Sequence, residues 1–494
     1  MCERDTGRFM MGTARWTIVA LVAAVVVACG GGGSSSNDTP AVGQAMFSVG
    51  AITGFGSVHL NGKKFETSKA KIMVNGQSGT QGDLQVGDVV EVKGHHDANA
   101  GTDVADEIDF RDSVRGPLAS IDSPQIDPAT HTLVVLGQNV LVSADTSFGD
   151  GISPASIAGL KVGDILEVSG QPNANGDILA TRIERKPAGT SFEVLGPVSA
   201  TDSNVKTFKI HALTIDFSTA MLQNFPSGGP KDGDLVEATG ASLGAAGQLL
   251  ASQVELRTGN DMQADVNADE EVEGPVTRFV SATDFDVAGR TVTTTGSTTF
   301  VGGPAADLML NVRVEVEGSV DSSGVLVASK VQFEHPATVR VRAKVDTVDT
   351  TAGTLTVLGV KFTATAITRF EDDSANHVST FNLSSLHVSD WVEVRGSESP
   401  AGSNQLSASR IERVDTQTVV ELEGPVKMAT SPQFTILSVP VNTTATTAFS
   451  DATEVSVTAS VFFTGLVGKD ADVHGTWDGT TLTAQSAALS NEHH

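Results

Sequence analysis

A short pattern recurs six times along the chain and strongly limits what the chain can fold into. Its clearest copies are residues 86–94 (VGDVVEVKG) and 162–170 (VGDILEVSG), and the sixth copy, 468–475, is degraded. Each copy closes on a glycine, and successive closing glycines are 70 to 79 residues apart. They are Gly94, Gly170, Gly240, Gly318, Gly396 and Gly475. Self-similarity of this kind indicates a repeat protein in which each copy is one structural unit.

Within a copy, apolar and polar residues alternate, as in Val90-Glu91-Val92, which is the period of a β-strand. Asn175-Gly176 is a hairpin turn signal, and residues 146–162 read as a loop with one helical turn. The resulting order is three strands, a loop or short helix, and two strands, as in a five-stranded OB-type barrel. We therefore expect an all-β tandem array of about six small, antiparallel, OB-like barrels of 70–79 residues each. Short paired sandwiches are the alternative.

The motif spacing also sets the expected domain boundaries. Cores of this size are marginal without disulfides or metals, so we expect neighbouring copies to pack together or to share linkers only a few residues long. Residues 258–270 (TGNDMQADVNADE) are expected to be an acidic linker. The six repeats are expected at 48–112, 113–187, 192–257, 271–335, 338–415 and 419–490.

The repeat resembles a bacterial family catalogued as domain of unknown function 5666. The resemblance rests on the VGDxVEVxG strings, on the ATRIE string at 180–184 and on residues 54–62 (GFGSVHLNG), and it spans about 48–490. It implies a secreted or lipid-anchored protein with tandem copies, and it implies no activity.

A glutamate recurs in the middle of five copies, at Glu91, Glu167, Glu237, Glu315 and Glu393. Because the flanking residues face the core, we expect each glutamate to point outward and to pair with a base on the next strand. The expected cross-strand pairs are Glu167 with Arg182, Glu315 with Lys330, and Glu393 with Arg410. The Gly-Asp positions are expected to be structural turn residues. They are Gly87, Asp88, Gly163, Asp164, Gly233, Asp234 and, without the glycine, Asp390.

The segment Asp265-Val266-Asn267-Ala268-Asp269 has the D-x-N-x-D start of a calcium loop. A full EF-hand is excluded, because Glu270 stands where the loop needs glycine and Val276 where it needs glutamate. Asp265, Asn267 and Asp269 therefore remain weak candidates for a looser calcium site. We expect no other cofactor.

The N-terminal segment predicts the compartment. Arg8 and Arg15 precede an apolar run over 16–28, which is the length of a signal-peptide core. The run ends in Val-Val-Ala-Cys, which resembles a bacterial lipobox, so residues 1–29 are the expected signal peptide and Cys29 the expected lipid anchor. Residues 30–47 begin with a Gly/Ser run typical of a flexible tether. We expect a lipid-anchored envelope protein, placed in the outer membrane if the cell is Gram-negative, that faces the periplasm or the cell surface.

Charge and motifs limit the function. A formal net charge of −27 disfavours nucleic acid, whose binding depends on lysine and arginine. Because nucleophile-elbow, Walker and zinc motifs are lacking, we expect a non-enzymatic scaffold that contacts the membrane only through the lipidated cysteine and binds a protein or envelope partner. A cleft within one copy that held a carboxylate of strongly raised pKa would count against this. The alternatives are a calcium- or carbohydrate-dependent surface adhesin and a periplasmic hydrolase, which no motif supports.

Overall fold

The structure is a computed structural model that describes residues 43–122, 130–149, 151–226, 228–257, 262, 264–335, 337–378, 380–398, 405–452 and 455–490. The predicted signal peptide, Cys29 and residues 30–42 of the expected tether lie outside these residues. The expected tether ends too late, because positions 45–47 already belong to the first strand, β1 (Ala45–Phe55). The described chain forms 36 strands, four 3₁₀-helices and one α-helix, α1 (Ala459–Phe462). No helix among the described residues combines the length and the hydrophobicity that crossing a membrane requires.

The fourth repeat shows the repeating unit in its simplest form. Its first three strands form an antiparallel ladder, and the third strand then pairs in parallel with the fifth. The fifth strand pairs with the fourth and the fourth with the first, so the ring closes. The elements are β21 (Asp269–Ser281), β22 (Asp284–Val287), β23 (Arg290–Val301), η3 (Ala305–Asp307), β24 (Arg313–Val320) and β25 (Leu326–Glu334). This five-stranded closed barrel is OB-like, which confirms the predicted fold class over paired sandwiches.

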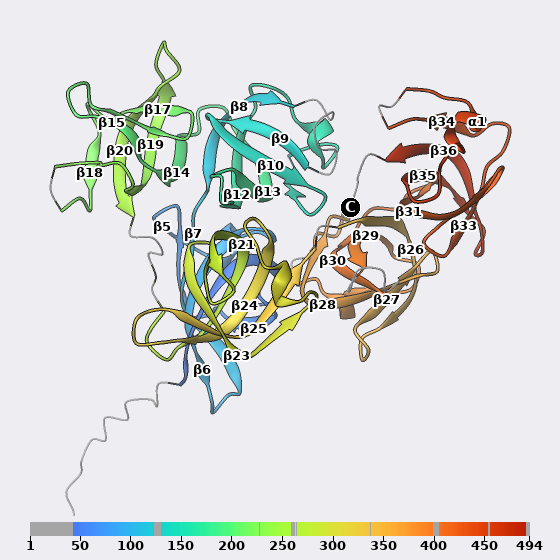
Figure 1. Ribbon diagram of the computed structural model, residues 1–494, viewed down its shortest axis with the longest axis horizontal. Helices are drawn as coiled ribbons and strands as arrows, with labels where there is room; N and C mark the ends of the chain where they lie inside the picture. Colours follow the sequence, from blue (N-terminus) through green and yellow to red (C-terminus); the bar gives the residue numbers. More distant parts are fainter. Residues whose placement is uncertain are drawn as a thin grey trace, which may run out of the picture. The chain divides into compact units, whose positions relative to one another are not determined.

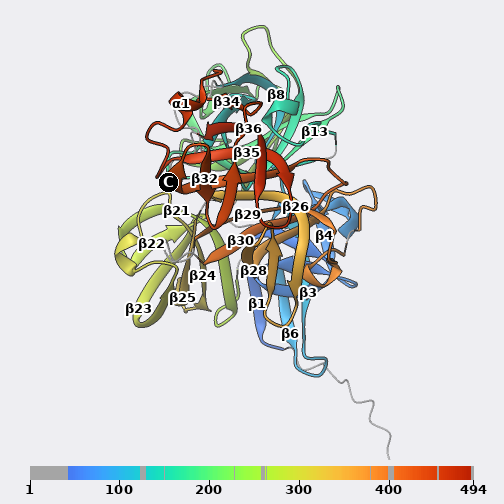
Figure 2. The same ribbon diagram turned by 90° about the vertical axis from the view of Figure 1, so that its right-hand side faces the viewer.

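The fifth repeat has the same five strands, and the other four repeats divide the third strand into two pieces. The fifth comprises β26 (Val339–Asp349), β27 (Thr354–Val357), β28 (Val360–Asp372), η4 (Leu383–Ser385), β29 (Trp391–Glu398) and β30 (Leu406–Arg413). The sixth comprises β31 (Val420–Thr430), β32 (Gln433–Ile436), β33 (Val439–Asn442), β34 (Ala448–Ser450), α1, β35 (Asp470–Trp477) and β36 (Leu482–Ser490). Figures 1 and 2 both show α1 beside β34 in this last barrel.

The first three repeats follow the same order. The first comprises β1 (Ala45–Phe55), β2 (Val58–Leu60), β3 (Lys63–Glu66), β4 (Lys71–Val74), β5 (Gln77–Gly79), η1 (Gln81–Asp83), β6 (Val89–Asp97) and β7 (Thr102–Phe110). The second comprises β8 (Val114–Ile121), β9 (Thr130–Val135), β10 (Gln138–Ser143), β11 (Ser147–Phe148), η2 (Ile157–Gly159), β12 (Ile165–Pro172) and β13 (Ile178–Lys186). The third comprises β14 (Phe192–Pro197), β15 (Ser199–Asp202), β16 (Thr207–Ile210), β17 (Leu213–Asp216), β18 (Met221–Gln223), β19 (Leu235–Leu243) and β20 (Leu249–Arg257).

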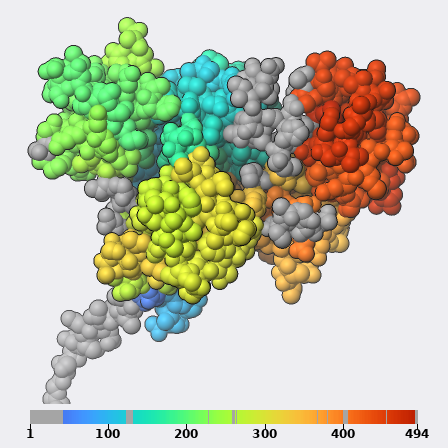
Figure 3. Space-filling view, viewed as in Figure 1, coloured from blue at the N-terminus to red at the C-terminus, as the bar shows by residue number. Residues whose placement is uncertain are grey.

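Each barrel encloses the apolar residues of its alternating strands. Val90 and Val92 of β6 are fully buried beside Ile108 of β7, as the strand period predicts. The first strand of the first repeat is unusual, because Phe47 and Val49 pack into the core of the fourth barrel whereas Met46 packs into that of the first. The C-terminal repeats, whose buried apolar residues form one core cluster, are the orange and red part of the space-filling view (Figure 3).

The first strands also join the barrels in pairs. β8 pairs with β14 through Val114 and Val194, and β26 pairs with β31 through Val341 and Leu422. β1 runs parallel to β21, which joins the first repeat to the fourth. The described strands therefore form three sheets of 12, 13 and 11 strands, and each sheet spans two barrels. The expected pairing of neighbours holds for the second and third and for the fifth and sixth repeats, but the first repeat shares its sheet with the fourth.

Candidate functional site

The closing glycine of every repeat occupies the same kind of position. The glycine lies in the fourth strand of its barrel, where the register between the fourth and fifth strands shifts at a β-bulge in the fifth. A Cβ atom on Gly318 would overlap the carbonyl oxygen of Val327, and one on Gly475 would overlap that of Thr483. The same overlap with the facing strand occurs at Gly94, Gly170, Gly240 and Gly396. These glycines therefore recur because two backbones approach closely there.

The Gly-Asp positions are turn residues. Gly87, Gly163 and Gly233 have φ values of +92°, +95° and +92°, a region that favours glycine. In each turn the following aspartate accepts a hydrogen bond from a backbone N–H three residues earlier. The four acceptors are Asp88, Asp164, Asp234 and Asp390. The four aspartates therefore stabilise the turns in which they lie.

The register corrects the predicted cross-strand pairs. Glu167 lies opposite Glu184, not Arg182, and Glu315 lies opposite Gln332, not Lys330. Glu393 lies opposite Glu412, not Arg410. In each case the opposing residue lies two positions beyond the predicted one, because the turn and the bulge together set the register.

The bases that were predicted as partners bind elsewhere. Lys330 pairs with Glu317 within its own hairpin. Arg182 of the second barrel and Arg410 of the fifth both pair with Glu371, at 3.2 and 2.7 Å. Burial alone would raise the pKa of Glu371, but Arg410 and Arg182 outweigh it and lower that pKa.

The repeated glutamates point out of their barrels, as predicted, but not into open solvent. Glu237, Glu315 and Glu393 are 5%, 0% and 2% exposed. Three of the five bind arginines or lysines: Glu167 and Glu393 bind cations of their own barrels, and Glu237 also binds Arg111 of the first barrel.

One such cluster joins the second and third barrels. Arg115 of β8 is 7% exposed, and its guanidinium lies 2.6 Å from Glu193 of β14 and 3.4 Å from Glu167 of β12. It also pairs with Asp112, whose side chain is fully buried. Glu167 has a second cation, Lys186, at 2.7 Å. We call these residues the Arg115 cluster.

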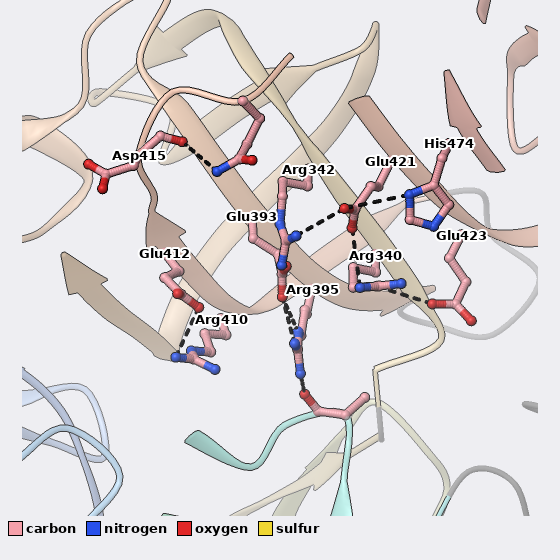
Figure 4. Close-up of polar contacts among 12 residues, drawn as sticks. Arg340, Arg342, Glu393, Arg395, Arg410, Glu412, Asp415, Glu421, Glu423 and His474 are labelled. Atoms are coloured by element: carbon pink, nitrogen blue, oxygen red, sulfur yellow. Dashed lines mark hydrogen bonds and ion pairs between the residues drawn. The ribbon is translucent and has the colours of Figure 1, made fainter. Parts of the chain in front are cut away.

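A second cluster joins the fifth and sixth barrels (Figure 4). Arg342 of β26 lies between Glu393 of its own barrel and Glu421 of β31. Arg340 contacts Glu421 and Asp472 of the sixth barrel, each at 3.3 Å. Burial works against the charge on Glu393, but Arg395 and Arg342 hold the pKa of Glu393 well below its usual range.

The calcium candidates lie on a turn that leads into β21. Asp265 pairs with Lys93 at 3.1 Å, Asn267 has a φ of +64°, and Asp269 begins the strand. No group of three or more His, Cys, Asp or Glu side chains could hold a metal ion in the described part of the chain. The expected linker is also shorter than 258–270, because β21 starts at Asp269 and Glu270 is fully buried, 2.6 Å from Arg290.

A cavity of about 470 Å³ lies where the first three barrels meet, with Ala288 of the fourth at its edge. Its apolar wall includes Ile178, Leu195, Val198 and Ile210. Its polar lining includes four charged residues, Glu91, Asp109, Arg111 and Arg257. Pockets at domain interfaces with apolar walls and a few polar groups are typical small-molecule sites.

Sequence reasoning missed the residues that join the barrels. Arg115, Arg340 and Arg342 stand on first strands, and so do Glu193, Glu421 and Glu423. A signal was present, because VRVR at 339–342 alternates arginines where VELE at 420–423 alternates glutamates. Opposite charges on two period-two strands indicate that those strands pair.

Comparisons with known proteins agree with this repeat reading. The family model "Domain of unknown function (DUF5666)" matches residues 48–109, 115–184, 273–332, 342–412 and 423–486. No curated protein matches the chain. A solved structure titled "drosophila Unr CSD456" is 15% identical and covers 45% of this chain and 97% of its own, with a TM-score of 0.13 that is too low to bear on the fold. Since five segments carry the family pattern and share one barrel fold, the chain belongs to the DUF5666 family as a tandem-repeat member.

Proposed function

We propose that this protein is a non-enzymatic scaffold of the bacterial cell envelope, anchored by lipid at Cys29 and built to present its barrels to a protein or envelope partner. The observation that carries the proposal is the use of the repeated charges. Glu237 binds Arg111 of the first barrel. Arg115 and Arg342, which pair with Glu167 and Glu393 of their own barrels, also pair with a glutamate of the next barrel. Residues that recur with this arrangement serve assembly of the array rather than chemistry at one centre.

The continuous sheets also support a role for the contacts between repeats in assembly of the array. Three sheets each span two barrels, so backbone hydrogen bonds add to the ion pairs between repeats. Buried ion pairs alone are weak evidence for stability, but they specify which surfaces meet. A surface-presenting scaffold benefits from such defined contacts.

The cavity beside Glu91 does not argue for an enzyme. Burial raises the pKa of Glu91 to about 7, and nearby Asp109 adds to the rise. The cavity lies between copies, however, and not within one copy. Its lining of apolar walls and a few polar groups suits binding of a small molecule.

Lipid labelling tests the anchor. Cells that express the full chain are fed an alkyne analogue of palmitate, and the purified protein is examined for label. We expect Cys29→Ser to abolish labelling and membrane fractionation. Cys2→Ser is the matched control and should label normally, because Cys2 precedes the expected cleavage site. Equal labelling of Cys29→Ser and the unaltered chain would overturn the anchor proposal.

Protease treatment of intact cells then tests the face, with an antibody to the last barrel as the probe. Loss of signal would place the array on the cell surface, and protection until the outer membrane is opened would place it in the periplasm.

The adhesin alternative has a separate test. Asp265 is already paired with Lys93, so we expect the melting temperature to be unchanged by millimolar calcium or by EDTA. A calcium-dependent rise would favour the adhesin.

A further inference from the structure

The strongest unassigned feature is the cavity of about 470 Å³ among the first three barrels. Its size falls within the range of about 300–1,000 Å³ that is usual for small-molecule sites. Three of its charged lining residues already bind one another, since Asp109 lies 2.9 Å from Arg111 and 3.8 Å from Arg257. The fourth, Glu91, is partly buried and accepts one backbone hydrogen bond, at 3.2 Å from the Met262 N–H.

Comparison of the repeats shows what Glu91 lacks. Its equivalents have cations: Lys186 lies 2.7 Å from Glu167, Arg111 lies 2.9 Å from Glu237, and Arg395 lies 2.6 Å from Glu393. Across the described residues no arginine or lysine forms an ion pair with Glu91. Glu315 also lacks a cation, but it is fully buried and does not line the cavity. Glu91 is therefore the repeat glutamate that combines a missing cation with access to the cavity.

The charged residues at the cavity disfavour an anionic ligand. The guanidinium of Arg111 pairs with both Asp109 and Glu237, and that of Arg257 contacts Asp109, Glu237 and Glu255. Four carboxylates, counting Glu91, thus surround two guanidinium groups. An anionic ligand would meet an excess of negative charge, whereas a cationic one would be attracted.

We propose that this cavity binds a small amphipathic cation, whose apolar body contacts Ile178, Leu195 and Ile210 and whose primary ammonium group pairs with Glu91. The ligand would supply the cation that the protein itself supplies to the equivalent glutamates of other repeats. This inference does not rest on the lipid anchor or on the envelope location.

Binding of this kind depends on pH. Burial raises the pKa of Glu91 to about 7; Asp109 on the neighbouring strand raises it too, while the Met262 N–H, Arg257 and Arg290 lower it. An alkylammonium group stays charged below about pH 10, as lysine does. The ion pair therefore needs ionised Glu91, and affinity for an amine should rise between about pH 6 and pH 8.

The test is calorimetric titration of the chain that follows the signal peptide with three probes of equal length: octylamine, octanol and octanoate. At pH 8 we expect octylamine to bind at least tenfold more tightly than octanoate. Glu91→Gln should weaken octylamine at least tenfold and remove its pH dependence, while octanol affinity changes less than twofold. Glu91→Gln keeps the side-chain shape and removes a charge from a partly buried site, so the variant is expected to fold.

Two further variants place the site. Glu315→Gln is the matched control, because it alters the other repeat glutamate without a cation, and octylamine affinity should be unchanged. Leu195→Trp should fill the cavity and weaken both octylamine and octanol. The proposal is overturned if octylamine fails to bind, if Glu91→Gln binds it as tightly as the unaltered chain, or if octanoate binds best.

Discussion

The guanidinium group of Arg115 in the second barrel donates to the carboxylate of Glu193 in the third across 2.6 Å. Their backbones are opposite one another in the register of β8 and β14, so the ion pair and the shared sheet occur at one place. Both residues are nearly excluded from solvent, at 7% and 3% exposure. The contact joins two repeats through residues that neither barrel needs for its own core.

Removal of Arg115 should be far more costly than removal of an exposed arginine. Arg115→Ala leaves the buried carboxylates of Asp112 and Glu193 without their cation, so we expect a loss of about 3–5 kcal/mol in the stability of the second and third barrels. Arg278 pairs with Asp284 and Asp286 but is 41% exposed, and Arg278→Ala should cost far less, because an exposed ion pair contributes little to stability. Hydrogen exchange measures the difference, on the β8 and β14 amides for Arg115→Ala and on the β21 and β22 amides for Arg278→Ala, and equal losses would contradict it.

The closing glycines should not tolerate a methyl group. Gly318→Ala forces a Cβ atom into the carbonyl oxygen of Val327, so one of the two strands must move. We expect a loss of about 1–3 kcal/mol. Gly296 is exposed and has open space around it, so Gly296→Ala should change stability by about 0.5 kcal/mol or less. Urea unfolding of the two variants checks this, and a neutral Gly318→Ala would refute the close-approach explanation.

Glu315 should destabilise the protein as pH rises. Both of its carboxylate oxygens are buried without a hydrogen bond, and burial raises its pKa to about 8, with Glu317, Glu271 and Glu334 adding to the rise against Lys330. Because the folded pKa lies above the unfolded one, this contribution to stability is complete below about pH 4.5 and is lost by about pH 8. Glu315→Gln should flatten that loss and raise stability at pH 8 by on the order of a few kcal/mol. Thermal melting from pH 4.5 to 8.5 measures it; a steeper loss in the variant would show that the carboxylate is stabilised instead.

His474 should act in the same pH direction in the last barrel. Its hydrogen bond with Asp472 and the nearby charge of Glu421 raise the pKa of His474, while burial and Arg340 oppose the rise. The stabilisation is therefore complete below about pH 6.5 and is lost as pH rises through the higher folded pKa. The ring is 40% exposed, so the effect should be small. His474→Gln should remove this pH dependence from the exchange rates of β35 amides, and an unchanged profile would exclude His474 as its source.

Much of the barrel could be predicted from local sequence. Alternation in Val90-Glu91-Val92 sets the strand faces, and the Gly-Asp turns and closing glycines mark strand ends, since these depend on a few neighbouring residues. The cross-strand partners could not be predicted. Glu167 lies opposite Glu184 and not Arg182, because a β-bulge shifts the register of the two strands. Register depends on a backbone detail that composition does not encode.

Contacts between barrels were harder to predict from the sequence. The pairing of β1 with β21 links residues more than 200 positions apart, and no local pattern indicates it. The cavity is formed by several repeats at once, so Glu91 reads in sequence like its four equivalents. One contact between barrels does have a signal in the sequence. Arginines alternate at 340 and 342 and glutamates at 421 and 423, and such complementary charges indicate that the two strands pair.

The central claim is that buried charges on the first strands hold neighbouring barrels together, and a double-mutant cycle on Arg115 and Glu193 tests it most directly. Arg115→Met, Glu193→Gln and the double variant are compared by the free energy of opening of the β8 and β14 amides in the full chain. We predict a coupling energy of about 1–3 kcal/mol, with the double variant less destabilised than the sum of the single ones. Additivity within about 0.5 kcal/mol would mean that the two residues act independently, and would contradict the claim.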